Sequence, residues 1–152
     1  MNIISILNRA AKLYGGSLQR FTGDSALVSF DSISCSEEHS FNAVCCAQLF
    51  LKLMKQISDS HHAKKAQALQ FKLAIHSGDI FISVDSNNEN SQVLLGKSLE
   101  TSFFLCKQSQ PGQLLISEAT YTQAGADERL QSSNSFEITM PTDNMSFMAY
   151  LI

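Results

Sequence analysis

The feature that most limits how this chain can fold is a predicted β-hairpin that lies between two helices. Residues 17–22 and 25–30 are short strand-like runs, and the Gly23-Asp24 pair between them suits a two-residue hairpin turn. Residues 2–14 precede the hairpin with apolar side chains at helical spacing. Residues 38–58 follow it as a long helix whose apolar side chains cover more than one face, which is typical of burial against a sheet. The order indicates an α+β fold.

The rest of the chain continues this alternation of strands and helices. Glycine and proline mark turns near Ser77-Gly78-Asp79 and at Pro111-Gly112. We expect one domain over residues 1–152, with a mainly antiparallel sheet covered by helices. The remaining predicted elements are a second hairpin of residues 68–77 and 80–84, a helix at 96–108, a strand at 113–117, a helix at 118–124, strands at 136–140 and 145–152, and polar loops at 59–67 and 85–91.

Composition argues against several classes of protein. The 152 residues carry a formal net charge of −3 and form no basic stripe, which argues against nucleic-acid binding. No apolar run reaches the roughly 18 residues that a membrane-spanning helix needs. We therefore expect a cytoplasmic chain, or the cytosolic domain of a larger membrane protein. Without a CxxC spacing, the four cysteines are expected to be buried free thiols rather than zinc ligands or disulfides: Cys35, Cys45, Cys46 and Cys106.

Three segments, in this order, resemble the class III adenylyl/guanylyl cyclase family. The first is GGSLQRFTGDSALVSF at residues 15–30, similar to the family's hairpin GG-x-x-x-K-x-x-GD-x-x-x-x-x-F. The second is FKLAIHSGDI at residues 71–80, similar to its strand R-x-G-I-H-x-G. The third joins a helix at residues 95–105 to PGQLLIS at 111–117, similar to the family's G-x-x-V-N-x-A-x-R helix and PG-x-I-x-I-S strand. The resemblance implies a nucleotidyl-cyclase-like fold with a ferredoxin-like core.

The resemblance also shows which catalytic positions differ. In the family, two aspartates hold two divalent ions that activate the ribose 3′-oxygen for attack on the α-phosphate. Asp24 matches one of these aspartates, and we expect this chain to lack the N-terminal strand that carries the other, so Mg²⁺ or Mn²⁺ would need a site completed in trans. The family's ribose-orienting Asn corresponds to Glu100, and its phosphate-stabilising Arg corresponds to Phe104. The two purine-selecting positions correspond to Arg20 and Val93.

Each of these residues also has a structural explanation. Asp24 suits a Gly-Asp turn for backbone reasons, and without a second carboxylate we favour this over a metal ligand. Arg20 lies on a strand, where a solvated or ion-paired side chain is favoured over contact with a nucleotide base. For Glu100 and Phe104, four residues apart on one helix, we favour ordinary aromatic packing with an exposed glutamate over a reshaped pocket. His76, inside an apolar strand, is expected to be a hydrogen-bonded structural histidine.

Three functions are compatible with this pattern. The favoured one is a catalytically degenerate cyclase-like domain with a regulatory or protein-interaction role in bacterial-type signalling. Because the family works as head-to-tail dimers, the resemblance implies a homodimer or a partner protein. The second is one part of an active cyclase, completed by a partner or by an upstream segment. The third is a non-catalytic sensor of a purine nucleotide, in which Asp24 and Arg20 would bind the ligand.

Overall fold

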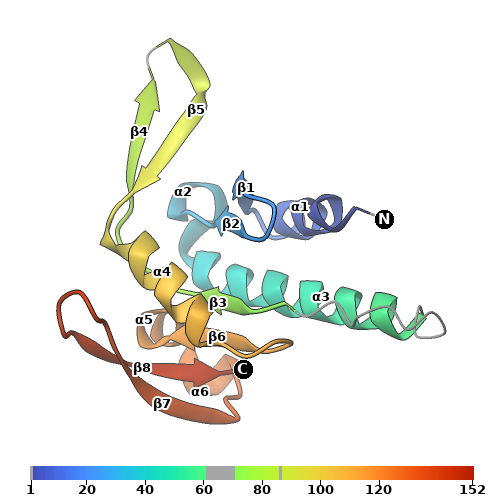
Figure 1. The fold of residues 1–152 in the computed structure, drawn as a ribbon, viewed down its shortest axis with the longest axis vertical. Coiled ribbons are helices and arrows are strands. Elements are labelled where there is room, and N and C mark those ends of the chain that lie inside the picture. Colours follow the sequence, from blue (N-terminus) through green and yellow to red (C-terminus); the bar gives the residue numbers. More distant parts are fainter. Residues whose placement is uncertain (1, 61–70, 86) are drawn as a thin grey trace.

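The structure is a computed structural model of the chain, and it describes residues 2–60, 71–85 and 87–152. Figure 1 shows strands and helices alternating along the chain. The helices are α1 (Ile3–Leu13), α2 (Ser32–Cys35), the 3-10 helix η1 (Ser36–Glu38), α3 (His39–Ser60), α4 (Lys97–Gln108), α5 (Glu118–Gln123) and α6 (Ala126–Arg129). The strands are β1 (Ser17–Phe21), β2 (Ala26–Ser29), β3 (Leu73–Ile75), β4 (Phe81–Asp85), β5 (Asn88–Leu95), β6 (Leu114–Ser117), β7 (Asn134–Thr139) and β8 (Ser146–Leu151).

The described strands form one four-stranded sheet and two separate hairpins. The sheet has the order β3-β6-β8-β7, in which β3 runs parallel to β6 and the other pairs are antiparallel. The hairpins are β1 with β2 and β4 with β5. The α+β class and the mainly antiparallel sheet that the sequence predicts are confirmed. Across the described part of the chain, no helix is long and apolar enough to cross a membrane.

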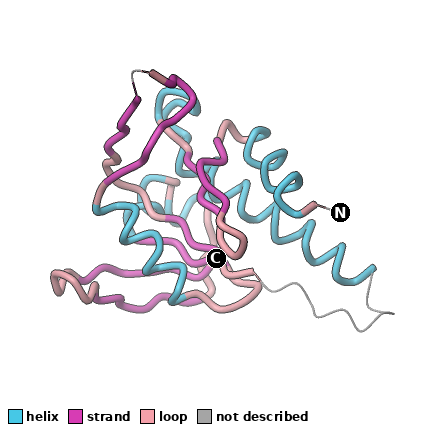
Figure 2. The backbone as a smooth tube through the Cα atoms, turned by 45° about the horizontal axis from the view of Figure 1, so that its top comes forward, coloured by secondary structure: helices cyan, strands magenta, loops and turns pink. Residues whose placement is uncertain are grey.

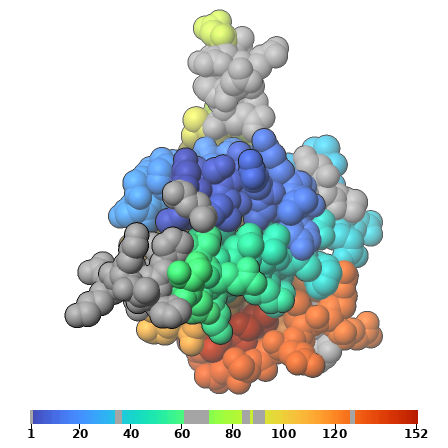
Figure 3. Space-filling model, turned by 90° about the vertical axis from the view of Figure 1, so that its right-hand side faces the viewer, coloured from blue at the N-terminus to red at the C-terminus, as the bar shows by residue number. Residues whose placement is uncertain are grey.

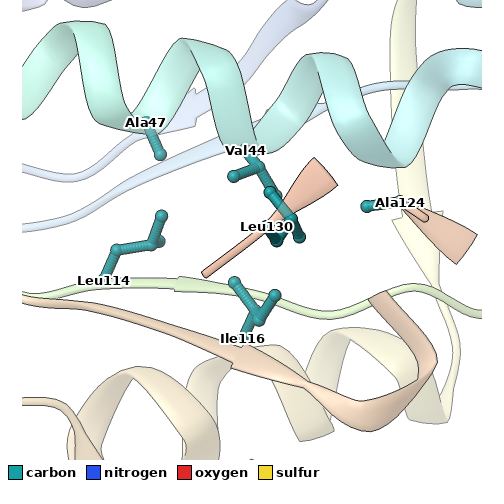
Figure 4. Packing of buried hydrophobic residues seen from close by; sticks show 6 residues of the cluster. All are labelled: Val44, Ala47, Leu114, Ile116, Ala124 and Leu130. Atoms are coloured by element: carbon teal, nitrogen blue, oxygen red, sulfur yellow. The ribbon is translucent and has the colours of Figure 1, made fainter. Parts of the chain in front are cut away.

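Strand β6 is the centre of the core because helices cover both of its faces. All four of its residues are buried, and its side chains alternate between the two sides of the sheet. Leu114 and Ile116 face α3, where Figure 4 shows them beneath Val44 and Ala47. Leu115 faces the other way and packs in a second cluster whose other buried members are Leu105, Ile138 and Ala149. The four-stranded sheet is therefore enclosed between α3 and α4.

The β1–β2 hairpin is held through the N-terminal helix rather than by the sheet. Ala10 and Ala11 of α1 pack with Cys46 of α3, and Val28 and Phe30 lie against this cluster. Figure 3 accordingly shows α3 between the N-terminal part of the chain and the C-terminal sheet. The predicted two-residue turn is confirmed by the hydrogen bond of 2.9 Å from the amide of Thr22 to the carbonyl of Ser25, which encloses residues 23–24.

Gly16, at the start of this hairpin, allows the ring of Phe30 at the other end to lie close to the backbone. A Cβ atom at this position would lie 2.6 Å from the ring of Phe30. That is shorter than any van der Waals contact between carbon atoms, so a larger residue would push the ring away. The glycine pair that the sequence shows after the first helix therefore has a packing role as well as ending α1.

The predicted second hairpin is wrong. The strand expected at residues 68–77 is described only as β3, and β3 pairs with β6 rather than with residues 80–84. Strand β4 instead pairs with β5, so most of the segment expected as a polar loop at 85–91 is β-structure. Alternation reveals a strand only where one face is buried, and β5 begins with a polar run that carries no such signal. Of the predicted loop at 59–67, residues 59–60 belong to α3 and the rest lies outside the described residues.

The β4–β5 hairpin, which we call the arm, extends away from the enclosed sheet (Figure 1 and Figure 2). Its register places Phe81 opposite Leu95 and Ser83 opposite Val93. Residues paired in this way share one face of the hairpin. Phe81 is 71% exposed and Leu95 is 53% exposed, so the arm presents an apolar face that the rest of the chain does not cover.

We predict that Leu105→Ala lowers the free energy of unfolding by about 2–5 kcal/mol, because it leaves a cavity beside β6. Leu13→Ala is the matched control, since both leucines are helical and Leu13 is 75% exposed whereas Leu105 is fully buried. The control should change stability by at most about 0.5 kcal/mol. Urea unfolding measures both, and equal values for the two variants would contradict the placement of α4 against the sheet.

Candidate functional site

The structure brings Arg20 of the hairpin against helix α4. The guanidinium carbon of Arg20 lies 5.8 Å from the centre of the Phe103 ring, within the range of a cation–π contact. Phe103 is 39% exposed, so this contact lies at the surface. It gives Arg20 a neighbour within the chain, and a role in binding a purine base stays a prediction.

Asp24 stands at the exposed tip of the β1–β2 turn. Gly23 has a φ of 65°, and the side chains of Thr22 and Ser25 contact one another at 2.7 Å across the turn. Among the described residues, no group of three or more His, Cys, Asp or Glu side chains could hold a metal ion. A role of Asp24 in binding a divalent ion stays a prediction.

Helix α4 places Glu100 and Phe104 in different environments. Phe104 is half-buried and packs against the cluster that contains Leu105 and Leu115. Glu100 is exposed in the first turn of the helix. The prediction of ordinary aromatic packing is confirmed for Phe104. An arginine at the same position would have to place its guanidinium against this apolar cluster or turn away from it.

His76 begins a chain of hydrogen bonds at the end of β3. Its Nδ1 atom lies 2.8 Å from Oγ of Ser117, and Ser117 also caps α5 by accepting from the amide of Thr120 at 3.4 Å. Oγ1 of Thr120 contacts Oγ of Ser117 at 3.3 Å and Oγ of Ser77 at 2.9 Å. The predicted structural role of His76 is confirmed, and burial lowers its pKa below the ordinary value of 6.5.

The chain of hydrogen bonds that begins at His76 continues to the first turn of α3. Oγ of Ser77 lies 3.0 Å from Oγ of Ser40, and Ser40 donates to Oε1 of Gln123 at 2.7 Å. Sequence reasoning missed these residues. The sequence could have revealed the role of Ser117, because a serine between a predicted strand and a predicted helix is a typical N-cap. No sequence pattern indicates the hydrogen bond between Ser40 and Gln123, because these residues are 83 positions apart.

A pocket of about 420 Å³ lies beside this hydrogen-bond chain. Glu100 and Phe104, which correspond to catalytic positions of the family in the sequence resemblance, are not part of its wall. The residues that line the pocket are His76, Ser117, Glu118, Ala119, Thr122, Gln123 and Phe147.

The three cysteine thiols that the structure describes have raised pKa values. Burial raises the pKa of Cys46 to about 11, and burial likewise raises the pKa values of Cys45 and Cys106. A thiol with a raised pKa carries little of the reactive thiolate at neutral pH. These three cysteines are free, as the sequence predicts, but only Cys46 is buried, whereas Cys45 and Cys106 are half-buried. The side chain of Cys35 lies outside what the structure describes.

The sequence and the backbone agree on the family of this chain. The sequence model of the adenylate and guanylate cyclase catalytic domain matches residues 20–152. The chain belongs to this family. It is therefore a cyclase-family domain, and its α4 and β1–β2 hairpin are the elements that carry the family's catalytic positions in the sequence resemblance.

Solved cyclase domains have a similar backbone at low sequence identity. The guanylyl cyclase Cya2 matches with a TM-score of 0.83 and 17% identity, covering 99% of this chain and 81% of that one. The adenylyl cyclase CyaB from P. aeruginosa matches with a TM-score of 0.85 and 19% identity, covering 99% and 78%. A non-canonical dimeric guanylyl cyclase domain of the RhoGC fusion protein from the aquatic fungus Blastocladiella emersonii matches with a TM-score of 0.69 and 21% identity, covering 99% of this chain and 82% of that one. Identities this low establish the cyclase fold alone. No curated protein sequence matches the chain.

We predict that Phe104→Ala lowers the free energy of unfolding by about 2 kcal/mol or more, because it removes a half-buried ring from the cluster at Leu115. Glu100→Ala, four residues earlier on the exposed side of the same cyclase-domain helix, should change it by at most about 0.5 kcal/mol. Thermal or urea unfolding distinguishes them. If Phe104→Ala were as stable as Glu100→Ala, Phe104 would be free of a packing role.

Proposed function

We propose that this cyclase-family domain makes no cyclic nucleotide and acts as a protein-interaction module in cytoplasmic signalling. The observation that carries the proposal is the apolar arm. Its exposed side chains include Phe81, Ile82, Val93 and Leu95, each at least 53% exposed. An apolar patch that the chain itself leaves uncovered is typical of a surface that binds another protein.

The environments of the catalytic positions support the absence of catalysis. Glu100 places a carboxylate where the family binds a triphosphate, so like charges would repel. Phe104 donates no hydrogen bond, and loss of one such donor costs on the order of 10²–10³ in rate. Among the described residues, Asp24 belongs to no group of three or more His, Cys, Asp or Glu side chains that could hold a metal ion. Each of these changes acts on a different part of the reaction.

We propose a homodimer as the assembly formed by the arm. Most soluble oligomers pair identical surfaces about a symmetry axis, so an apolar arm on each copy can be buried by the other. The exposed arm carries this choice, because the solved RhoGC domains that match this chain include a non-canonical dimer and also monomeric forms. In a homodimer the arm would contribute binding energy mainly through Phe81 and Leu95, whose side chains share one face.

We predict that the double variant Phe81→Ser and Leu95→Ser is monomeric where the wild type is dimeric, because it removes a pair of opposite apolar side chains from one exposed face of the arm. Sedimentation equilibrium over a range of protein concentrations measures the change. The control exchanges two exposed apolar residues outside the arm, Leu13→Ser and Ile33→Ser, which are 75% and 94% exposed. A monomeric wild type, or an arm variant that still dimerises, would contradict the homodimer.

The second candidate, an active cyclase completed by another segment, is favoured by the free edge of β3. Among the described strands β3 pairs only with β6, although side chains of β3 pack into the clusters on both sides of the sheet. The amide of Leu73 bonds to the carbonyl of Gln113, so in a parallel ladder the amide of Ala74 points to the opposite edge. Such an edge is a template for an added strand.

Hydrogen exchange tests this candidate. In the isolated chain the amide of Ala74 should exchange faster than those of Leu73 and Ile75. If a completing segment pairs with β3, a longer natural form of the chain or a partner complex would protect Ala74. If the Ala74 amide exchanged at the same rate in both forms, no segment would pair with β3, and this would contradict the second candidate.

A further inference from the structure

The arm is joined to helix α4 without a loop. Strand β5 ends at Leu95 and α4 begins at Lys97, so a single residue, Gly96, connects them (Figure 1). Gly96 is the N-cap of the helix, and its carbonyl accepts a hydrogen bond of 3.2 Å from the amide of Leu99. The backbone angles of Gly96 therefore set the direction in which β5 leaves α4.

Gly96 has a backbone conformation that other residues avoid. Its φ is 136° and its ψ is 167°, in a region that is essentially restricted to glycine. Space around the residue is not the obstacle, because an added Cβ would lie 3.5 Å from the ring of Phe81 and 3.6 Å from the carbonyl oxygen of Asp79. These are ordinary contact distances. A substitution at Gly96 therefore acts through the backbone angles of the connection.

The other strand of the arm also contacts the first turn of α4. Gly78 lies in the connection from β3 to β4, and its backbone packs against the side chain of Ser98. A Cβ on Gly78 would overlap with Oγ of Ser98 and would lie 3.2 Å from its Cβ, which is closer than carbon atoms normally pack. Both strands of the arm thus meet the same turn of α4, one through the backbone and one through close packing.

This turn of α4 is attached to the rest of the chain. Leu99 is buried, and Lys97 forms an ion pair with Asp143 in the turn between β7 and β8. Because the ion pair is partly exposed, burial of Leu99 contributes most of this attachment. The arm is therefore supported by a part of the helix that does not move freely.

We propose that Gly96 is a positioning residue that fixes the direction of the arm relative to α4, and that Gly78 and Ser98 support this direction from the other strand. We call these three residues the joint. The arm is then a rigid extension of α4, and the joint determines whether its apolar face can meet a second copy. The effect on dimerisation rests on the proposed homodimer, whereas the fixed direction of the arm does not.

Residual dipolar couplings of the backbone amides measure the direction of the arm, because they report the orientation of each N–H bond in a common frame. They are measured on the full chain carrying Phe81→Ser and Leu95→Ser, which removes the apolar pair proposed to form the dimer. Without the ring of Phe81, any effect of Gly96→Ala comes from the backbone angles alone. We expect the couplings of the arm and those of β6 and β8 to fit one alignment tensor. With Gly96→Ala, the arm couplings should no longer fit the tensor of the sheet.

Gly112→Ala is the matched control for this change. Gly112 also has a positive φ, 80°, and an added Cβ would have nothing within 4 Å, but the residue lies in the turn before β6. Its substitution should leave the arm couplings on the tensor of the sheet. Gly78→Ala is the second variant and should also change the direction of the arm. Adding Ser98→Gly should restore it, because this removes the side-chain atoms that the new Cβ would meet.

Sedimentation equilibrium of chains with an otherwise intact arm measures the consequence for assembly. Gly96→Ala should weaken dimerisation about tenfold or more, because a misdirected arm has to be reoriented before it binds. Gly112→Ala should leave dimerisation unchanged.

Three results would overturn the joint. They are arm couplings that do not fit the tensor of the sheet when the joint is intact, equal arm couplings in Gly96→Ala and Gly112→Ala, or a Gly78→Ala variant whose arm keeps its direction. If Gly96→Ala does not fold, Gly78→Ala with and without Ser98→Gly decides the question. A fixed arm in a chain that stays monomeric at every concentration would support the joint and contradict the homodimer alone.

Discussion

The burial of β6 on both faces is the constraint on which the rest of the structure depends. Leu114 and Ile116 require a helix on one side, and α3 provides it; Leu115 requires one on the other, and α4 provides it. Fully burying an aliphatic side chain of this size contributes about 1.5–3 kcal/mol. The positions of α4, of α5 and of the neighbouring β3 follow from this strand, and these elements carry Phe104, the pocket and His76.

The same constraint supports the proposal that this cyclase fold persists without the family's catalytic side chains. In this chain Phe104 contributes to the cluster that attaches α4 to the sheet. A family arginine at this position contributes a charged donor to the reaction instead. Replacing a charged donor by an apolar ring beside Leu115 adds buried surface and removes the cost of placing a charge near an apolar core. On the proposed function, this exchange would stabilise the fold at the expense of the reaction.

The elements that the sequence predicted correctly are those with a local pattern of apolar or turn residues. The first hairpin and the helices at 38–58 and 96–108 carry periodic apolar residues or defined turn residues, so their patterns were readable. The pairing of β3 with β6 could not be predicted from the sequence, because β6 lies about forty residues later and a parallel pair has no connecting turn. The polar start of β5 gave no alternation either. The chain of hydrogen bonds at His76 could not be predicted for a related reason. Its residues Ser40, Ser77 and Thr120 come together only when α3, β3 and α5 pack.

We propose that this cyclase-family domain carries the fold without the reaction. Mass spectrometry of cyclic AMP and cyclic GMP tests it most directly, after incubation of the purified chain with ATP or GTP and excess Mn²⁺ or Mg²⁺. Asp24→Ala is the control, because Asp24 is the residue at a family metal position. We predict no product above that control. Product from the wild type that disappears in Asp24→Ala would contradict the claim and would show that the missing groups are replaced by others.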